Sequence, residues 1–213
     1  MPAMSIDAPR LFLITPPIVE AASFAPQLAA ALGAAGVACV LLRTQTRDPG
    51  EAKKIIKALA PIAQERDVAV LVEGDPQLAV RAGADGCHVE AGAEALQSAL
   101  STLKPDRIVG AGALQTRDAA MTAGETGVDY LMFGGPDHLE EHDSVLERVA
   151  WWAEIFNIPC VAYAQALSEV ADFAAAGADF IALSDAVFAD PRGSGAAMAE
   201  VAATLASLSE KAH

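Results

Sequence analysis

The chain has 213 residues, of which 53% are hydrophobic and 20% charged, so it can bury a large core and is too apolar for a disordered protein. Its formal net charge of −14 argues against a nucleic-acid partner or an anionic membrane partner, because its 14 Lys and Arg residues form no basic cluster. A small anionic ligand stays open, since a pocket of backbone amides binds phosphate whatever the net charge.

The first ten residues, MPAMSIDAPR, have neither the basic start nor the apolar core of a signal peptide. No apolar run approaches the ~18 residues of a membrane span. We therefore expect a cytoplasmic protein with a flexible leader over residues 1–10 and a single domain over residues 11–213. Three cysteines without a close pair favour buried reduced thiols over a zinc site or a catalytic thiol: Cys39, Cys87 and Cys160.

One pattern recurs four times along the chain: a helix end, a glycine and an apolar strand. Its clearest copy is AAGADFIALSD, and the glycines of the four copies lie roughly 45–50 residues apart, which leaves room for another strand between them. The copies are Ala34–Arg43, Arg81–Glu90, Glu125–Gly134 and Ala175–Asp185. The additional strands are Leu11–Thr15, Val68–Val72, Arg107–Ala111 and Pro159–Tyr163.

Eight apolar strands that alternate with helices are typical of a parallel sheet buried on both faces. An open doubly wound sheet usually has five or six strands, so the count favours an α/β fold of the closed (β/α)8 TIM-barrel type. In such barrels the chemistry lies at the carboxyl ends of the strands, where the candidate residues of this chain are concentrated.

In the first quarter of the chain, Phe24–Ala35 is an alanine-rich helix that Gly36 ends. The second strand finishes at Leu42 and leads into a polar loop that contains Arg43 and Gln45. Asp48 then precedes Pro49, a pattern typical of a helix N-cap with proline at the first helical position.

Carboxylates follow the third and fourth strands. Glu73 and Asp75 could hold a cation, although Asp75 before Pro76 is also a good helix N-cap, whereas Glu73 has no such structural role. Strand alternation puts His88 and Glu90 on one face. If that face is the barrel interior, Glu90 lies at the mouth and His88 one layer below it, where the histidine either meets a ligand or is a hydrogen-bonded core residue.

The fifth strand ends in Gly110-Ala111-Gly112-Ala113, which leaves room for a ligand or eases packing, and Thr116 is a candidate cap for the next helix. After Gly134 and Gly135 comes the polar segment Asp137–Asp143. Its H-x-x-E-H order matches a metalloprotease motif that requires a helix, but the flanking Gly-Gly-Pro and the capping box Ser144…Glu147 favour a solvated loop.

The adjacent tryptophans of the following helix, Trp151 and Trp152, cannot share one helical face. One of them could therefore be exposed at a subunit contact, and a homodimer is our expectation. Farther along, Gln165 follows the seventh strand, and Ser168 is a candidate cap for the helix after it.

Ser184 follows the eighth strand, where the following amides of many barrels bind phosphate, and Asp185 opposes that interpretation by its charge.

Two segments resemble the thiamine phosphate synthase family and its relatives, the thiazole tautomerases. Leu78–Val89 (LAVRAGADGCHV) is similar to the family's LALALGADGVHL, and Ala175–Pro191 is similar to AGADGVAVVSAIFAAPDP. The resemblance, which runs from Leu11 to Pro191, implies a (β/α)8 barrel. It also implies a transferase of thiamine biosynthesis that joins an aminopyrimidine diphosphate to a thiazole phosphate with Mg²⁺ and releases pyrophosphate.

The functional positions of that family are only partly retained. Of its Gln-x-Arg-x-Lys motif, Arg43 matches, while Leu41 and Gln45 replace the glutamine and the lysine. Gly74 stands in place of the magnesium-binding aspartate, which leaves Asp75 as a weak metal candidate. The segment with the family's second metal carboxylate aligns with Glu90–Ala93, and its serine after the fifth strand aligns with Gly112. The family's lysine-bearing loop aligns with Asp137–Asp143, and its phosphate-binding Gly-Gly aligns with Ala164-Gln165. The tautomerase histidine is replaced by Leu114 or Gln115.

Three functions follow as hypotheses. The first is a diverged barrel with weakened or lost synthase activity that binds a small phosphorylated molecule. The second is a working synthase with relocated metal ligands, and the third is a non-catalytic regulatory or interaction protein. The candidate substrate-binding residues are Arg43, Gln45, Glu73, His88, Glu90, Gly134, Gly135, Gln165 and Ser184.

Overall fold

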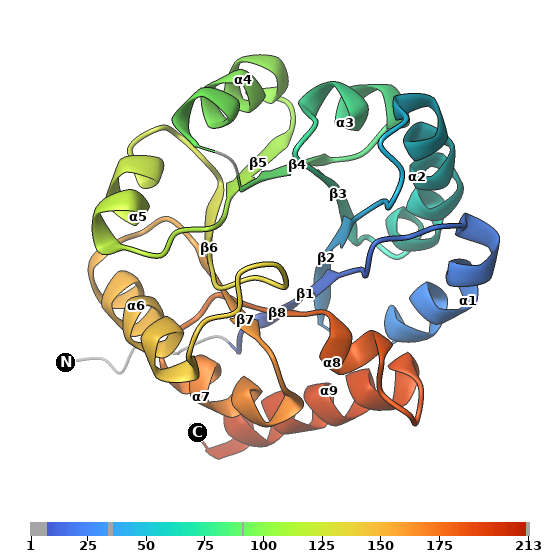
Figure 1. The fold of residues 1–213 in the computed structure, drawn as a ribbon. Helices are drawn as coiled ribbons and strands as arrows, with labels where there is room; N and C mark the ends of the chain where they lie inside the picture. The colour runs from blue at the N-terminus through green and yellow to red at the C-terminus, as the bar shows by residue number, and fades with distance from the viewer. Residues whose placement is uncertain (1–7, 34–35, 91, 212–213) are drawn as a thin grey trace.

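The structure, a computed structural model, describes residues 8–33, 36–90 and 92–211. Eight parallel strands close into a barrel in which each strand pairs with its sequence neighbours and β1 pairs with β8 (Figure 1). This confirms the predicted TIM barrel. The strands are β1 Arg10–Ile14, β2 Val37–Leu42, β3 Ala69–Glu73, β4 Gly86–Val89, β5 Ile108–Ala111, β6 Tyr130–Phe133, β7 Cys160–Ala164 and β8 Phe180–Leu183.

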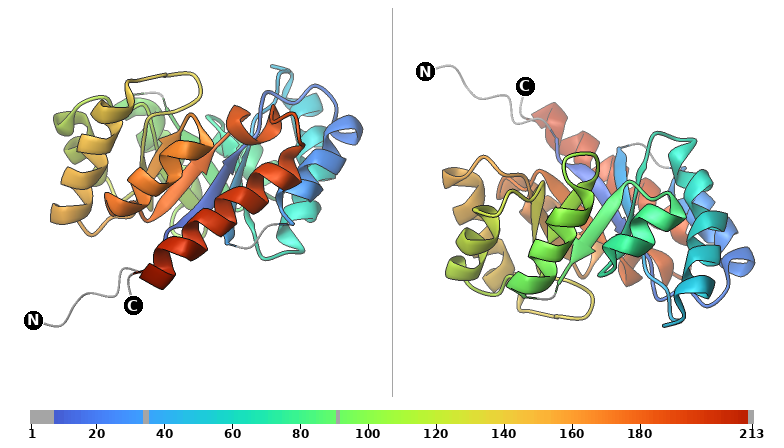
Figure 2. Two further views of the ribbon diagram at one scale, coloured as in Figure 1. Left: turned by 90° about the horizontal axis from the view of Figure 1, so that it is seen from below. Right: turned by 90° about the horizontal axis from the view of Figure 1, so that it is seen from above.

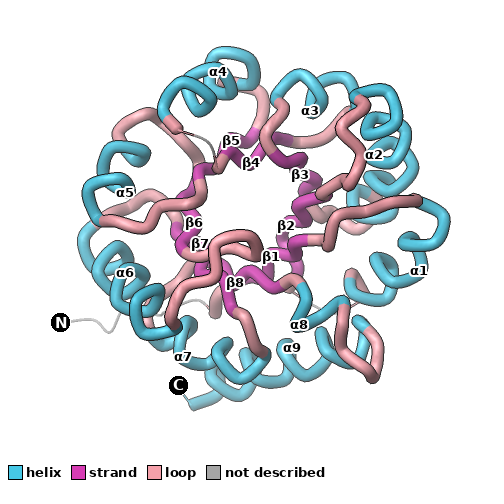
Figure 3. The backbone as a smooth tube through the Cα atoms, in the orientation of Figure 1, coloured by secondary structure: helices cyan, strands magenta, loops and turns pink. Residues whose placement is uncertain are grey.

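The helices form a ring around the strands (Figure 3). None of the helices in the described part of the chain combines the length and the apolar character that crossing a membrane requires. They are α1 Ala21–Ala31, α2 Pro49–Gln64, α3 Pro76–Ala82, α4 Ala93–Leu103, α5 Arg117–Gly124, α6 His142–Ile155, the 3-10 turn η1 Leu167–Glu169, α7 Val170–Ala175, α8 Asp185–Phe188 and α9 Ser194–Lys211.

The expected boundaries of three helices were wrong. Helix α1 begins three residues early because Glu20 is extended and its carbonyl accepts the Ser23 hydroxyl, and it ends near Leu32. Helix α6 begins at His142 rather than after Ser144, because the Glu141 carbonyl already accepts the Ser144 N–H. Ser168 lies inside η1, where the carboxylate of Glu169 accepts the Gln165 N–H instead.

Other expected caps are confirmed. The side chains of Asp48, Asp75 and Thr116 accept the backbone N–H groups of Glu51, Leu78 and Ala119 at 2.7, 3.0 and 3.1 Å. The three cysteines are free and buried, and burial raises the pKa of Cys87 and Cys160 to about 12. Of the expected leader, residues 1–7 lie outside the described residues, and β1 already begins at Arg10.

The recurring sequence pattern has a structural explanation at the amino ends of the strands. Gly83, Gly127 and Gly177 adopt positive φ angles of 76°, 92° and 90° after a helix. Two residues later an aspartate side chain accepts an N–H of the preceding strand: Asp85 from Val70 at 2.7 Å, Asp129 from Val109 at 2.7 Å and Asp179 from Cys160 at 2.8 Å. The copy at Gly36 has Ala38 at this position.

Side chains that alternate along the strands fill the inside of the barrel and form a cluster separate from the larger core between strands and helices. The inner cluster includes Phe12, Ile14, Cys39, Leu41, Leu71, Tyr130, Met132, Val161, Tyr163 and Ala182. Continuing the alternation towards the carboxyl ends of the strands leads to Arg43, Glu73 and Glu90, so the fold gathers these polar side chains at one end of the barrel.

The segment that joins β6 to α6 covers this end of the barrel. In Figures 1 and 3 the loop leaves β6, crosses the ring of strands towards β1 and β8 and returns to α6, and the left view of Figure 2 shows it standing above the strand ends. It contains Asp137 and His138, so residues distant in sequence from Arg43 are brought over the barrel mouth.

Candidate active site

Arg43 is the central cation of the mouth. Its side chain is only 8% exposed, and its backbone N–H donates to the Thr15 hydroxyl at 3.0 Å. The guanidinium Nε donates to Glu73 Oε1 at 2.9 Å, and a terminal nitrogen donates to the carboxylate of Asp137. The arginine predicted to bind substrate is therefore already engaged by two carboxylates of the chain itself.

Three carboxylates converge around this arginine. Glu73, Glu90 and Asp137 each offer an oxygen within 4.8 Å of the others. Burial, followed by the nearby Glu73 carboxylate, raises the pKa of Glu90, while His138 acts in the opposite direction. His138 Nε2 lies 3.5 Å from Glu90 Oε2. The loop between β6 and α6, called the covering loop below, therefore contacts Arg43 through Asp137 and Glu90 through His138.

Beneath the mouth, His88 lies fully buried, and the face that strand alternation assigned to His88 and Glu90 is the barrel interior. Its Nδ1 lies 2.9 Å from the Tyr130 hydroxyl, and its Nε2 has no hydrogen-bond partner among the described residues and lies 3.9 Å from Glu90 Oε1. Burial, assisted by the Arg43 guanidinium, lowers the pKa of His88 to about 4, so the ring is neutral at pH 7.

Two glycines of the fifth strand region make room for this pair. A Cβ atom at Gly110 would lie 1.9 Å from Cζ of Tyr130, and one at Gly112 would lie 2.5 Å from Nε2 of His88. The sequence linked these glycines either to a ligand or to packing. In this structure, Gly110 and Gly112 leave room for the side chains of Tyr130 and His88.

The covering loop is fixed to the barrel at its second half. Arg148 pairs with Glu140 at 2.6 Å, and the Gln165 side-chain amide donates to the Glu140 carbonyl at 2.6 Å. His142 lies 3.7 Å from Glu169 Oε1 and 3.3 Å from Asp172 Oδ2. The side chain of Gln165, one of the predicted substrate residues, therefore holds the loop.

The metalloprotease-like order His138, Glu141, His142 does not form a common site. His138 lies in the loop and contacts Glu90, whereas His142 begins α6 and contacts carboxylates of η1 and α7. The loop interpretation is thus confirmed for His138.

Ser184 and the glycine pair lie close to the same end of the barrel. Ser184 is 1% exposed, and its hydroxyl has no partner among the described residues, while the four-residue α8 begins with Asp185. A Cβ at Gly135 would lie 3.3 Å from Glu90 Oε1, which puts this glycine against the acidic group. Burial and then Asp185 raise the pKa of the nearby Tyr163 to about 12.

The remaining predicted residues are peripheral. Gln45 is exposed, and its backbone N–H donates to the Ile18 carbonyl at 3.0 Å. Asp75 caps α3 and is not part of the converging carboxylates, so the proposed metal role does not fit its geometry. Trp152 is buried and donates to the Ile158 carbonyl at 2.8 Å, and Trp151 is half-buried beneath the Arg117 guanidinium.

Asp137 and Tyr130 were missed as site residues. Asp137 stood out in the sequence only as part of a polar loop, and its contact with Arg43 spans 94 positions of the chain. Tyr130 lies at the start of a strand, and a period-two reading from Tyr130 towards Met132 was the only signal that it faces the barrel interior.

Known proteins give this geometry a context. The family model described as thiamine monophosphate synthase matches residues 11–187. A thiamine-phosphate synthase of Rhodospirillum centenum is 40% identical over 196 residues, which cover 90% of this chain and 95% of the relative. A thiamine-phosphate synthase of Hyphomonas neptunium is 36% identical over 199 residues, covering 89% of this chain and 90% of the relative.

Solved structures agree on the fold. Thiamine phosphate pyrophosphorylase from Pyrococcus furiosus superposes with a TM-score of 0.79 at 21% identity, covering 95% of this chain and 98% of that chain. 3-Hexulose-6-phosphate synthase from Salmonella typhimurium superposes with a TM-score of 0.72 at 15% identity, covering 92% and 99%. Proteins with different activities thus share this barrel fold, whereas the relatives matched by sequence above are both thiamine-phosphate synthases. On the family match and the identity to these relatives, the chain belongs to the thiamine monophosphate synthase family.

Proposed function

We propose that this chain binds a small phosphorylated molecule at the barrel mouth and that its thiamine phosphate synthase activity is weakened or lost. Arg43 is the cation that a phosphate would contact at the mouth, and its engagement by Glu73 and Asp137 supports the weakened activity. A phosphate that approaches Arg43 must displace at least one carboxylate, and the remaining acids repel it. Glu90, a third carboxyl group in the same cluster, adds to this barrier whenever it is ionised.

The reaction that the family resemblance implies develops negative charge on departing pyrophosphate. Cations and metal ions stabilise such charge, and each lost contact typically costs about 2–4 kcal/mol of barrier. Gln45 stands at a lysine position of the family motif and Gly74 at a metal aspartate, so at least two such contacts are missing. Together these losses, about 4–8 kcal/mol, correspond to roughly three to six powers of ten in rate if nothing replaces them.

A turnover assay tests this function. Thiamine phosphate formation from the aminopyrimidine diphosphate and the thiazole phosphate is measured with Mg²⁺, using the Rhodospirillum centenum relative as the reference enzyme. We expect a rate at least about 100-fold below the reference, the loss that a single missing charge contact would cause. Comparable rates for the two proteins would refute the weakened activity.

Removing the acidic group of the loop tests the part played by Arg43. In Asp137→Asn the guanidinium loses one carboxylate partner, so we expect calorimetry to show pyrophosphate binding that is tighter by about tenfold, the size of one charge-assisted contact. Asp143→Asn is the matched control, because Asp143 is exposed near the same loop. Equal pyrophosphate affinities for the two variants would contradict the role of Asp137.

A working synthase with relocated metal ligands is the second candidate. Glu73, Glu90 and Asp137 supply only oxygen donors, the ligand type that Mg²⁺ prefers, and they fit such an ion in kind and spacing. Arg43 competes for two of them. A bound Mg²⁺ would supply charge to the leaving pyrophosphate, and His88 Nε2 and Ser184 Oγ would be free to orient a substrate. Mg²⁺-dependent turnover at the reference rate would favour this candidate.

A further inference from the structure

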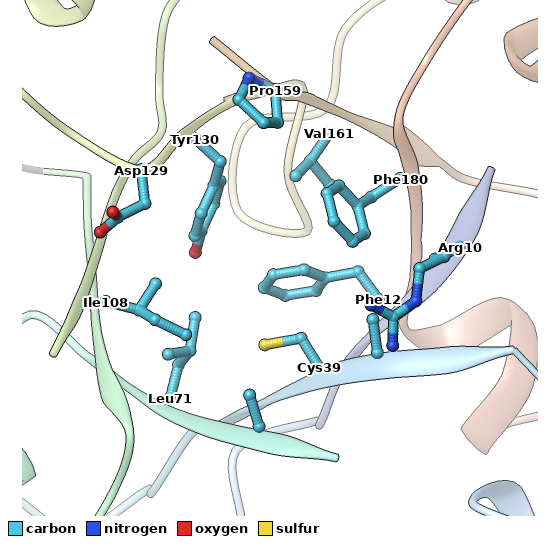
Figure 4. A pocket seen from close by; sticks show the side chains of 12 residues that line it. Arg10, Phe12, Cys39, Leu71, Ile108, Asp129, Tyr130, Pro159, Val161 and Phe180 are labelled. Atoms are coloured by element: carbon cyan, nitrogen blue, oxygen red, sulfur yellow. The ribbon is translucent and has the colours of Figure 1, made fainter. Parts of the chain in front are cut away.

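We propose a second binding site, for a small planar aromatic acid, in a cavity at the amino ends of the strands, opposite the mouth. The cavity has a volume of about 290 Å³. Figure 4 shows the rings of Phe12, Tyr130 and Phe180 and the Cys39 sulfur around one hollow. Leu71, Ile108 and Val161 also line it.

The lining favours an aromatic ligand. Barrel interiors are normally filled by layers of large side chains, but here the layer at the amino end includes Ala38 and Ala69 and leaves the hollow open. Apolar cavities of about 150 Å³ already bind benzene, so this one has room for a substituted ring. The surrounding rings offer edge-to-face contacts of the kind that Phe12 and Tyr130 make with each other, at 5.6 Å and 62°.

The charge at the rim favours an acid. Arg10 lines the cavity, and no carboxylate of the described residues forms an ion pair with it. Asp129 lies on the opposite side in Figure 4, where Lys104 and the Val109 N–H already engage it. A ring with one carboxylate can therefore direct that group to Arg10 and its apolar edge to the interior.

The recurring pattern explains why β2 contributes no aspartate beside Arg10. In three copies the residue two places after the glycine is an aspartate that binds a strand N–H, whereas the copy in β2 has Ala38. Ala38 and Arg10 both line the cavity. Ala38 in place of the aspartate thus leaves an apolar wall beside a guanidinium that has no ion pair within the described part of the chain. Burial raises the pKa of Cys39, so its thiol is neutral and contributes packing rather than reactivity.

Benzoate and its neutral analogue benzamide are suitable probes. Benzoate titrated into the ¹³C-methyl-labelled protein should shift the methyl signals of Leu71, Ile108 and Val161 and show intermolecular contacts with them. Arg10→Gln should weaken benzoate binding by about tenfold and leave benzamide within about twofold, because only benzoate loses a charge-assisted contact. Arg43→Gln, at the mouth, should leave benzoate binding unchanged.

Two changes at the cavity wall complete the test. Ala38→Asp restores the acid of the pattern beside Arg10, so benzoate binding should be lost while benzamide still binds. Ala69→Leu fills the hollow, so both probes should fail. The wild-type titration remains decisive if either variant does not fold. The site is refuted if benzoate causes no shifts in the millimolar range, if its contacts map to the mouth, or if Arg10→Gln binds benzoate as the wild type does.

Discussion

His88 combines complete burial with a titratable ring. One ring nitrogen meets the Tyr130 hydroxyl, and the other faces Glu90 and has no hydrogen-bond partner in the described ranges of the chain. Burial raises the pKa of Tyr130, so its hydroxyl keeps its proton and can donate to Nδ1, which then puts the histidine proton on Nε2. The neutral ring presents an N–H towards the mouth, where a ligand oxygen could accept it.

The lowered pKa of His88 predicts a loss of stability in acid. Its pKa is about 4 in the fold against an ordinary value of 6.5, so between these values the unfolded chain binds the extra proton. Stability from the neutral ring is complete above pH 6.5 and is lost as the pH falls towards 4, by about 3 kcal/mol in total. Denaturant unfolding at a series of pH values measures this slope.

A matched pair of variants isolates the histidine from the carboxyl groups that titrate in the same range. His88→Gln should remove this part of the pH dependence, whereas His138→Gln, at a more exposed histidine, should retain it. If wild type and His88→Gln lose the same free energy of unfolding between neutral and acidic pH, His88 is not the source.

At the scale of elements, the aspartates of the repeated pattern join neighbouring strands. Asp85 precedes β4, and its carboxylate accepts the Val70 N–H of β3 at 2.7 Å and the Gln64 amide of α2 at 3.0 Å. Asp129 and Asp179 make the equivalent strand contact. The repeated pattern therefore stabilises the barrel at the amino ends of its strands and does not contribute to the chemistry at the mouth.

We predict that Asp85→Ala destabilises the barrel by about 1–3 kcal/mol, the usual penalty for leaving a buried backbone N–H without a partner. Asp106→Ala should change stability by less than about 0.5 kcal/mol, as expected for an exposed surface position. Denaturant midpoints at equal slopes provide the comparison. Similar midpoints for both variants would mean that the aspartate contact contributes nothing to the fold.

The same elements show what a sequence can and cannot predict. All eight strands, the caps at Asp48 and Asp75 and the shared face of His88 and Glu90 follow from local periodicity and cap chemistry, which act within a few residues. The pairing of Arg43 with Asp137 joins segments 94 residues apart, and it depends on the path of a loop without regular structure. No local pattern encodes that path, so the central contact of the site was not predictable.

For the whole molecule, negative charge dominates the electrostatics. The chain has 28 acidic and 14 basic residues, and carboxylates pair with five of the basic side chains that the structure describes: Arg43, Lys104, Arg117, Arg148 and Arg192. Because acidic side chains outnumber basic ones, the acids that have no basic partner repel one another at long range. Salt screens this repulsion over roughly 8–10 Å near physiological ionic strength, so added NaCl should raise the melting temperature.

Comparing salts at equal ionic strength separates this general screening from binding at the mouth. If Glu73, Glu90 and Asp137 hold a divalent cation, MgCl₂ should raise the melting temperature more than NaCl does, because a ligand that binds only the folded state stabilises it. Glu90→Gln should abolish this excess, and Glu154→Gln, at an exposed position outside the cluster, should not. If the two salts raise the melting temperature of the wild type equally, charge screening alone explains the increase. That result would favour a mouth that no longer binds a metal ion, in line with weakened synthase activity.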